Sequence, residues 1–249
     1  MDKALYVAMT GARASLQAQG TVSHNLANVD TKGFKAALAG TEAFRIQGEG
    51  FPSRVDAMLI DPGFDSRTGS QMATGRSLDV SLQQNRWLAV QAADGSQAYT
   101  RNGELSVTPN GQLVTASGRP VLDDNGNPIA VPPAQSIDIG ADGTVSIIPQ
   151  GEGPQTMAVV GRMRIVDAAP QQLARGADGL MRPVDPQTPP AQANGNNLTV
   201  GVLEGSNVDA AGALVQMIQL QRQFEMQVKV IRSGDEMAQS SNSLLRLGG

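Results

Sequence analysis

The two ends of the 249-residue chain carry a helical hydrophobic period, while its middle carries a strand-like alternation. Apolar residues recur about every 3.6 positions in an amphipathic helix and every second position in a half-buried strand. Because a segment with one period does not settle into the other structure, this switch constrains the fold class. The sequence predicts an α+β chain: long N- and C-terminal helices form a coiled-coil-like inner domain, and the middle is an antiparallel all-β domain.

Near the N-terminus, apolar or small residues recur at a spacing that matches one stripe of an amphipathic helix. The stripe consists of Leu5, Ala8, Met9, Ala12, Leu16, Val22 and Leu26. We therefore predict an N-terminal helical segment over residues 1–35. We expect it to end near Gly33, because glycine permits a positive φ at a helix end.

The C-terminal segment, residues 201–249, is predicted to contain a helix of about 40 residues, roughly 60 Å long. Its apolar residues share one heptad seam, which consists of Leu214, Met217, Phe224, Val228, Ile231 and Leu245. Gln221, Asp235 and Asn242 interrupt this seam. A polar residue on such a seam weakens packing but fixes the register and the number of partners.

Residues 78–200 hold short alternating runs that are separated by turn signals. Asp94-Gly95 is a hairpin signal between WLAVQA (87–92) and QAYTR (97–101). Similar turns at 109–111 and 140–143 separate the next pairs of runs. This spacing predicts an antiparallel barrel or sandwich. Residues 36–77 are predicted to be an irregular, extended connector, and residues 183–198 a loop rich in Pro and Asn.

Composition excludes several classes of site. The chain has no Cys, which rules out disulfides, a Cys nucleophile and thiolate metal ligands. Its formal net charge is −4, and Lys and Arg form no cluster of the kind that a nucleic-acid-binding face needs. No apolar run reaches the length of about 18 residues that a membrane span requires. The first 20 residues also lack the continuous apolar core of a secretory leader.

No catalytic, cofactor-binding or metal site is predicted. His24 is the only His, so a Ser-His-Asp triad would have to use it. It lies within the N-terminal helical pattern, where a packed or solvated role is the simpler interpretation. The acidic run DDNGN (123–127) has Pro128 and Ala134 where a calcium loop needs Gly and Glu, so we interpret it as a turn.

The two helical ends raise the question of what covers their apolar stripes. Two interpretations stay open: a closed monomer in which the end helices pair against the β domain, or ends that fold when neighbouring copies supply the missing surface. Ordering about 70 terminal residues costs on the order of 70–140 kcal/mol of backbone freedom, which one helix pair is not expected to offset. We therefore favour ends that are loosely ordered in the free chain. Contacts of this head-to-tail kind build rings or helical assemblies.

Four blocks, in order along the chain, resemble a known family. The first is NLANVDTKGF after ALYVAMTGA, and its signature positions are Asn25, Leu26, Ala27, Asn28, Gly33 and Phe34. The others are residues 76–122, GVLEGSNVD (201–209) and QRQFEMQVKVI (221–231). On these residues, nearly the whole chain resembles the flagellar rod and hook protein family of bacteria. MDKALYVAM and RQFEMQVKVI are more similar to its proximal-rod branch than to its distal-rod branch.

The resemblance implies a structural subunit of the flagellar basal-body rod, in the periplasmic space, rather than an enzyme. It implies export without a cleaved leader through the flagellar type III apparatus, and no cofactor. The implied partners are other copies, neighbouring rod proteins and the export apparatus, with no nucleic acid and no membrane insertion. The terminal helices would form a coiled-coil inner lining, with the β domain outside, in a shaft that transmits torque. A secreted β-rich binding module with helical arms is the alternative of another class.

From the seams and the resemblance together, we predict one set of assembly-interface residues. They are Leu5, Met9, Leu16, Asn25, Leu26, Asn28, Gly33, Phe34, Leu214, Met217, Phe224, Val228, Ile231 and Leu245. Asn25 and Asn28 lie about one turn apart and share a helix face, where their amides need hydrogen-bond partners. The hypothesis is that they fix the register between packed helices. The alternative is helix-end chemistry within one chain.

Overall fold

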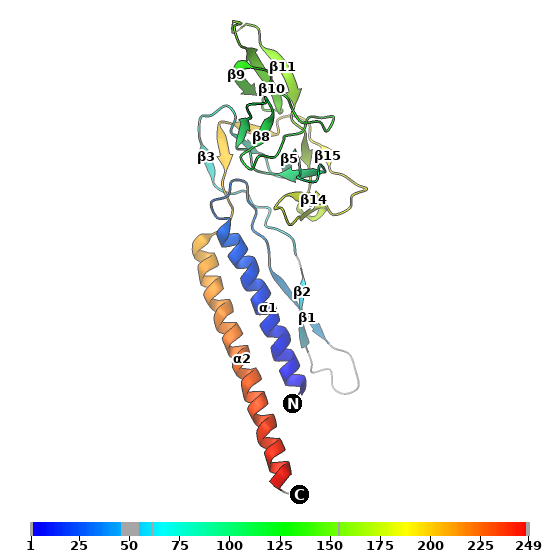
Figure 1. The fold of residues 1–249 in the computed structure, drawn as a ribbon, viewed down its shortest axis with the longest axis vertical. Coiled ribbons are helices and arrows are strands. Elements are labelled where there is room, and N and C mark those ends of the chain that lie inside the picture. The colour runs from blue at the N-terminus through cyan, green and yellow to red at the C-terminus, as the bar shows by residue number, and fades with distance from the viewer. Residues whose placement is uncertain (1, 46–54, 61, 154, 248–249) are drawn as a thin grey trace. The chain divides into compact units, whose positions relative to one another are not determined.

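The structure is a computed structural model, and it describes residues 2–45, 55–60, 62–153 and 155–247 (Figure 1). The chain divides into two compact units, and neither is continuous in sequence. The helical unit comprises Met1–Ala27, Ala37–Pro62 and Asp209–Gly249. The β unit comprises Asn28–Ala36 and Gly63–Val208. An N-terminal helix, a mostly antiparallel β middle and a C-terminal helix are thus confirmed.

Two long helices form the main part of the helical unit. Helix α1 (Asp2–Ala27) and helix α2 (Ala210–Leu247) contact each other and lie side by side. Strands β1 (Gly40–Arg45) and β2 (Val55–Ile60) pair as an antiparallel hairpin, with Gly40 opposite Ile60. Strand β2 also contacts α1. The described helices include none that is long and apolar enough to cross a membrane.

Small residues bring α1 close to α2. Ala12, Ala14 and Ser15 are buried, and a Cβ atom on Gly11 would lie 2.7 Å from the amide nitrogen of Gln227. A small side chain lets two helix backbones approach, whereas a large one holds them apart. The predicted stripe is therefore divided: Ala12 and Val22 are buried, whereas Met9 and Leu16 are exposed.

Helix α1 ends at Ala27, which is earlier than the expected end near Gly33 in the predicted segment 1–35. Gly33 does have the predicted positive φ, +70°, but it lies beyond the helix. The physical reason is that residues 28–36 belong to the β unit, where their backbone groups bond to distant segments instead of continuing the helical ladder. At the other end, Val202–Glu204 form a strand, and α2 begins only at Ala210.

The β unit contains short strands throughout its length. In chain order they are β3 (Gln71–Ala73), β4 (Val80–Leu82), β5 (Arg86–Gln91), β6 (Gln97–Thr100), β7 (Leu105–Val107), β8 (Leu113–Thr115), β9 (Ala134–Ile139), β10 (Thr144–Pro149), β11 (Ala158–Arg162), β12 (Ile165–Asp167), β13 (Leu173–Arg175), β14 (Met181–Pro183), β15 (Ala191–Gln192), β16 (Leu198–Val200) and β17 (Val202–Glu204). A 3₁₀ turn, η1 (Pro170–Gln172), precedes β13.

All strand pairs in the described residues are antiparallel. The largest sheet has the order β13-β14-β6-β5-β12-β15, and a second has the order β11-β10-β9. Two-stranded pairs are β16-β4, β17-β3 and β7-β8. The three predicted turns, at 94–95, 109–111 and 140–143, are confirmed as the connections of β5-β6, β7-β8 and β9-β10.

Two stretches that we expected to be irregular contain strands. Residues 36–77 hold β1, β2 and β3, and residues 183–198 hold β15 and the start of β16. Strand β3 pairs with β17, so that Gln71 lies opposite Glu204. A strand of three residues whose partner lies so far along the chain leaves little local pattern, and its pairing energy comes from the tertiary structure.

Both faces of β5 are buried. Leu88 and Val90 pack into the larger hydrophobic cluster of the β unit, while Trp87 and Ala89 pack into a second cluster on the opposite face. Alternate residues of a strand point to opposite faces, so this short run serves two cores at once. In the second cluster Phe64 packs edge-on against Trp87, with ring centroids 5.5 Å apart.

Candidate functional site

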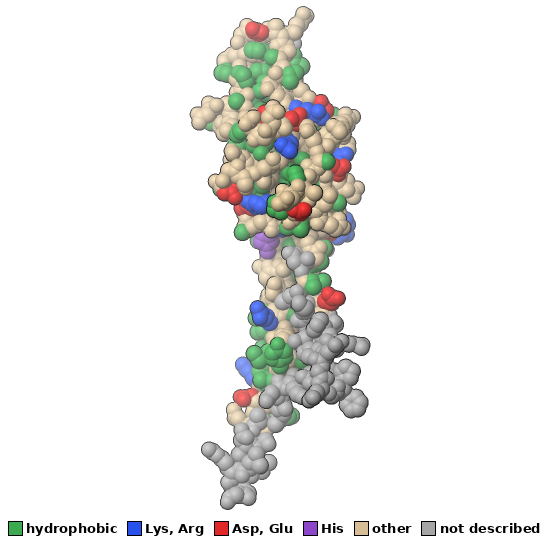
Figure 2. Space-filling model, turned by 90° about the vertical axis from the view of Figure 1, so that its right-hand side faces the viewer, with side chains coloured by type: hydrophobic (Ala, Val, Ile, Leu, Met, Phe, Trp, Pro, Cys, Tyr) green, Lys and Arg blue, Asp and Glu red, His purple; other side chains and the backbone are tan. Residues whose placement is uncertain are grey.

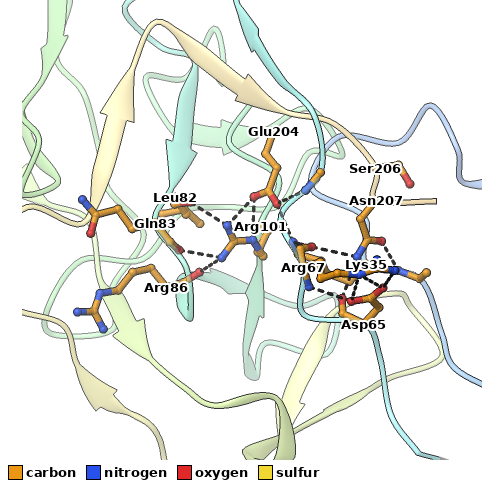
Figure 3. Close-up of polar contacts among 12 residues, drawn as sticks. Lys35, Asp65, Arg67, Leu82, Gln83, Arg86, Arg101, Glu204, Ser206 and Asn207 are labelled. Atoms are coloured by element: carbon orange, nitrogen blue, oxygen red, sulfur yellow. Dashed lines mark hydrogen bonds and ion pairs between the residues drawn. The ribbon is translucent and has the colours of Figure 1, made fainter. Parts of the chain in front are cut away.

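Residues Asn28–Ala36 connect α1 to the rest of the chain but are part of the β unit, and we call them the strap. Residues Glu204–Asn207 run from the last residue of β17 toward α2, and we call them the seat. The strap docks on the seat, although the two are far apart in sequence. Figure 3 shows the polar side chains that converge there.

Glu204 is the acceptor at the centre of this site. Its side chain is almost completely buried, with 1% of its surface exposed. Oε1 accepts from Nζ of Lys35 at 2.6 Å and from the backbone N–H of Gly69 at 3.1 Å. Oε2 accepts from Nη2 and Nε of Arg101 at 2.6 and 2.8 Å. Both oxygens of the buried carboxylate are thus paired with donors, as a buried charge requires.

Arg101 is held by backbone carbonyls as well as by the Glu204 carboxylate. Nη1 donates to the carbonyls of Gln83 and Arg86, and Nη2 donates to the carbonyl of Leu82, at 2.8–2.9 Å. Its guanidinium also lies 5.7 Å from the ring centroid of Trp87. These contacts bind the chain between β4 and β5 to the residue that follows β6. Arg101 is therefore an integral part of the β unit.

Lys35 comes from the strap and enters a buried environment. Nζ donates to Glu204 and also to the carbonyl of Arg67 at 2.7 Å. Burial lowers the pKa of Lys35 from its ordinary value, and the hydrogen bond to Glu204 opposes this shift. Lys35 and Arg101 thus share one carboxylate. Docking of the strap therefore moves the ammonium group of Lys35 out of water, which costs desolvation free energy.

Asn207 connects three chain segments through its side chain. Oδ1 accepts from the N–H of Ala36 at 2.7 Å, and Nδ2 donates to the carbonyls of Asp65 and Arg67 at 2.9 and 3.0 Å. An amide has two donors and one acceptor group, and here both kinds are used. Asn207 therefore fixes the end of the strap against the first residues of the long β segment.

Gly33 and Phe34 complete the docking of the strap. The N–H of Gly33 donates to the carbonyl of Glu204 at 2.8 Å, and a Cβ atom on Gly33 would lie 2.3 Å from the carbonyl group of Arg101. Only glycine fits this close approach with a positive φ. The ring of Phe34 lies 4.5 Å from the guanidinium carbon of Arg175, which also donates to the carbonyl of Lys35.

The two asparagines of the N-terminal motif have partners in their own chain. Asn25 bonds the backbone of Ala37 through both polar atoms of its amide, each at 2.8 Å. Oδ1 of Asn28 accepts from the hydroxyl of Thr31 at 3.1 Å. These contacts agree with the helix-end alternative. A role of either residue between subunits stays a prediction.

The other predicted interface residues lie mainly on the two helices. Met9 and Leu16 on α1 and Leu214 on α2 have about half of their side chains exposed, while Met217, Phe224, Val228 and Ile231 are half-buried, as are Leu5 and Leu26. The side chain of Leu245 lies outside the described residues. Figure 2 shows apolar side chains on the surface, with acidic and basic side chains interspersed on the face in view.

Sequence reasoning did not predict the cluster of Lys35, Arg101, Glu204 and Asn207. A signal was present, because Glu204 and Asn207 lie inside GVLEGSNVD and Lys35 directly follows Gly33-Phe34. The pattern did not show that these two motifs meet. A buried Lys or Glu is rare unless it is paired, and pairing cannot be seen without the fold.

Three family models match the chain. Residues 5–35 match the model described as flagella basal body rod protein, residues 82–147 match the flagellar hook protein FlgE/F/G D1 domain, and residues 199–244 match the flagellar basal body rod FlgEFG protein C-terminal region. The chain is also 45% identical to the flagellar basal-body rod protein FlgF of Escherichia coli, over 99% of this chain and 100% of that protein.

The chain belongs to the flagellar basal-body rod protein family. It is 43% identical to FlgF of Salmonella typhimurium, over 99% of this chain and the whole of that protein. It is 32% identical to the rod protein FlgG of Buchnera aphidicola from Schizaphis graminum, over 98% of this chain and the whole of that protein. The chain is thus more similar to these two FlgF proteins than to this FlgG protein.

The three matched regions of this rod protein family each contain one charged member of the site. Lys35 is the last residue of the first region, Arg101 lies in the second, and Glu204 lies in the third. The site therefore joins the N-terminal, central and C-terminal parts of the chain through one buried carboxylate.

Proposed function

We propose that this chain is a structural subunit of the flagellar basal-body rod and forms part of the proximal, torque-transmitting shaft. Copies assemble axially through α1 and α2, which form a coiled-coil-like inner domain together with the helices of neighbouring subunits. The names of the relatives support the role, because each is a flagellar basal-body rod protein. The remaining partners are neighbouring rod proteins and the flagellar type III export apparatus, and the subunit acts in the periplasm without a cofactor.

One structural observation carries the assembly proposal. Glycines lie where α1 and α2 contact each other, Gly11 beside Gln227 and Gly234 beside Leu5, whereas several of the larger apolar residues of both helices are exposed. The exposed residues are Tyr6, Val7, Met9, Leu16, Leu214, Val215, Ile218, Met226, Val230 and Met237. In a self-contained helix pair the large side chains would be buried first, because burying each one contributes about 1.5–3 kcal/mol. This distribution suits helices that have neighbours on more than one side.

An aspartate scan tests this assignment. Leu16→Asp and Ile218→Asp place a charge at positions that are 50% and 54% exposed in the single chain. The folded chain should tolerate them, with an unchanged thermal midpoint, whereas burial in an assembly would require the charge to be desolvated. We expect cells that carry either variant to lose motility and purified basal bodies to lack the protein.

Val184→Asp is the matched control, since Val184 is an apolar residue of the β unit with 61% exposure. Its carriers should swim normally. Normal motility and normal incorporation of Leu16→Asp and Ile218→Asp would show that these helix faces are not buried in the rod.

A further inference from the structure

The strap is held mainly by the seat. Four hydrogen bonds join them: the Gly33 N–H to the Glu204 carbonyl, Lys35 Nζ to the Glu204 carboxylate, the Ala36 N–H to the Asn207 side chain, and the Asn207 N–H to the Phe34 carbonyl. Residues 65–67 add the Asp65 N–H to the Ala36 carbonyl and the bond from Lys35 to Arg67, and Arg175 adds a hydrogen bond to the Lys35 carbonyl and its contact with the ring of Phe34. Without the seat, the strap would lose most of these partners.

The converse does not hold, because the seat has contacts that do not involve the strap. The N–H of Gly205 donates to the carbonyl of Ser70 at 2.7 Å, and Glu204 lies in β17, which pairs with β3. The Glu204 carboxylate would still have Arg101 and Gly69 as donors, and Asn207 would still donate to Asp65 and Arg67. Departure of the strap would therefore leave no buried carboxylate unpaired.

Of the two cations bound to Glu204, Lys35 is the one whose lost hydrogen bonds water can most readily replace. The ammonium group of Lys35 lies at the end of a flexible side chain and would regain full hydration in water. The guanidinium of Arg101, in contrast, is fixed by three carbonyls of the β unit. Removing one member of a buried ion pair is costly when the other is left alone. Here the remaining partner, Glu204, keeps two charge-assisted hydrogen bonds from Arg101, both to Oε2.

We propose that the strap is a releasable latch, which docks after the seat has formed and can open while the rest of the β unit stays folded. Opening separates residues 28–36 from the β unit and leaves Glu204 paired with Arg101. The strap leaves the helical unit after Ala27 and returns to it at Ala37, so its release would free a loop with a contour length of about 30 Å whose two ends both lie in that unit. The latch thus determines whether residues 28–36 are held by the β unit.

Residue-resolved amide hydrogen exchange of the full chain tests the latch, because local opening is measured at each bonded N–H. Lys35→Met keeps the length of the side chain and does not touch the acceptors of Gly33 and Ala36. We expect exchange at both of these amides to accelerate at least tenfold. Gly205, in the seat, and Leu113, in the core, should change less than twofold, since neither depends on the strap.

A second variant guards against a folding defect of the first. Asn207→Ala removes the acceptor of the Ala36 N–H but not that of Gly33, so faster exchange at Gly33 reports concerted release. Asp178→Asn is the matched control, because Asp178 pairs with Arg182 and not with a residue of the strap. It should change the exchange rate of none of these amides. The proposal is overturned if Gly205 and Leu113 accelerate together with the strap amides, or if the strap amides keep wild-type rates in both variants.

Discussion

Asn25 and Ala37 form a closed pair of hydrogen bonds within the helical unit: Nδ2 of Asn25 donates to the Ala37 carbonyl, and Oδ1 accepts from the Ala37 N–H, each at 2.8 Å. The preceding residue, Ala36, gives its N–H to Asn207 of the β unit. The boundary between the two units therefore falls between adjacent residues, each of which is held by an asparagine of its own unit. Asparagine suits both positions because its amide satisfies a donor and an acceptor together.

We expect Asn25→Ala to loosen the start of the segment after the strap. The substitution leaves the Ala37 N–H and carbonyl without their side-chain partner, at a cost of about 1–3 kcal/mol if water does not replace it. Amide exchange at Ala37 should accelerate, while exchange at Ala36, which is bonded to Asn207, should not. Asn28→Ala is the comparison, and its smaller effect is expected because the bond of Asn28 to Thr31 is exposed. Equal protection of Ala37 in wild type and Asn25→Ala would contradict this role.

Gly33→Ala should destabilise the β unit by more than the usual glycine replacement. The positive φ alone costs roughly 1–2 kcal/mol for an L-residue. The new Cβ atom would also lie 2.3 Å from backbone atoms of Arg101, which cannot move aside as a flexible side chain can.

Gly95→Ala separates the two contributions, since Gly95 has a φ of +82° but no atom within 4 Å of its Cβ position. Thermal unfolding should show a lower midpoint for Gly33→Ala than for Gly95→Ala. Identical midpoints would mean that the close approach to Arg101 contributes nothing.

Glu204→Gln should be among the most damaging polar substitutions in the chain. The neutral amide removes the charge that two buried cations share, and its NH₂ group faces donors where an acceptor is needed. Breaking a buried pair in this way costs about 3–5 kcal/mol. Asp178→Asn, which breaks a more exposed pair with Arg182, should cost about 1 kcal/mol or less.

Fluorescence of Trp87 provides a local measurement for this comparison, because it is the only Trp and lies beside Arg101. Chemical unfolding followed through this residue should shift to lower denaturant concentration in Glu204→Gln and barely move in Asp178→Asn. Similar shifts in both variants would show that the buried cluster is no stronger than a surface pair.

Local patterns in the sequence account for the parts of the fold whose contacts are local. The turn at Asp94-Gly95 is visible because the two residues themselves favour the hairpin, and Asp94 accepts from the N–H of Ser96. The helical stripes were visible for the same reason. The end of α1 could not be predicted in this way, because residues of the strap form hydrogen bonds with Glu204 and Asn207, which are distant in sequence, instead of continuing the helix. The stripe pattern also could not show that Ala12 is buried while Leu16 is half exposed, since both fit one stripe.

Acid should destabilise the β unit through carboxylates that are hydrogen-bonded in the folded chain. The hydroxyl of Thr144, with help from its backbone N–H, holds the pKa of Asp142 below its usual range, and the guanidinium of Arg182 does the same for Asp178. A carboxyl with a lower pKa when folded binds fewer protons than it does when unfolded. Its stabilisation is therefore present above about pH 4 and is lost as the pH falls through the folded-state value.

The thermal midpoint of the wild-type chain should consequently decline as the pH falls below about 4. Asp142→Asn cannot titrate at this turn, yet its side-chain oxygen can still accept from the Thr144 N–H, which Asp142 binds at 3.1 Å. The variant should be slightly less stable than wild type at neutral pH and should lose less stability on acidification, so the two curves converge. Curves that stay parallel down to pH values well below the ordinary Asp pKa would exclude Asp142 as a source of the acid sensitivity.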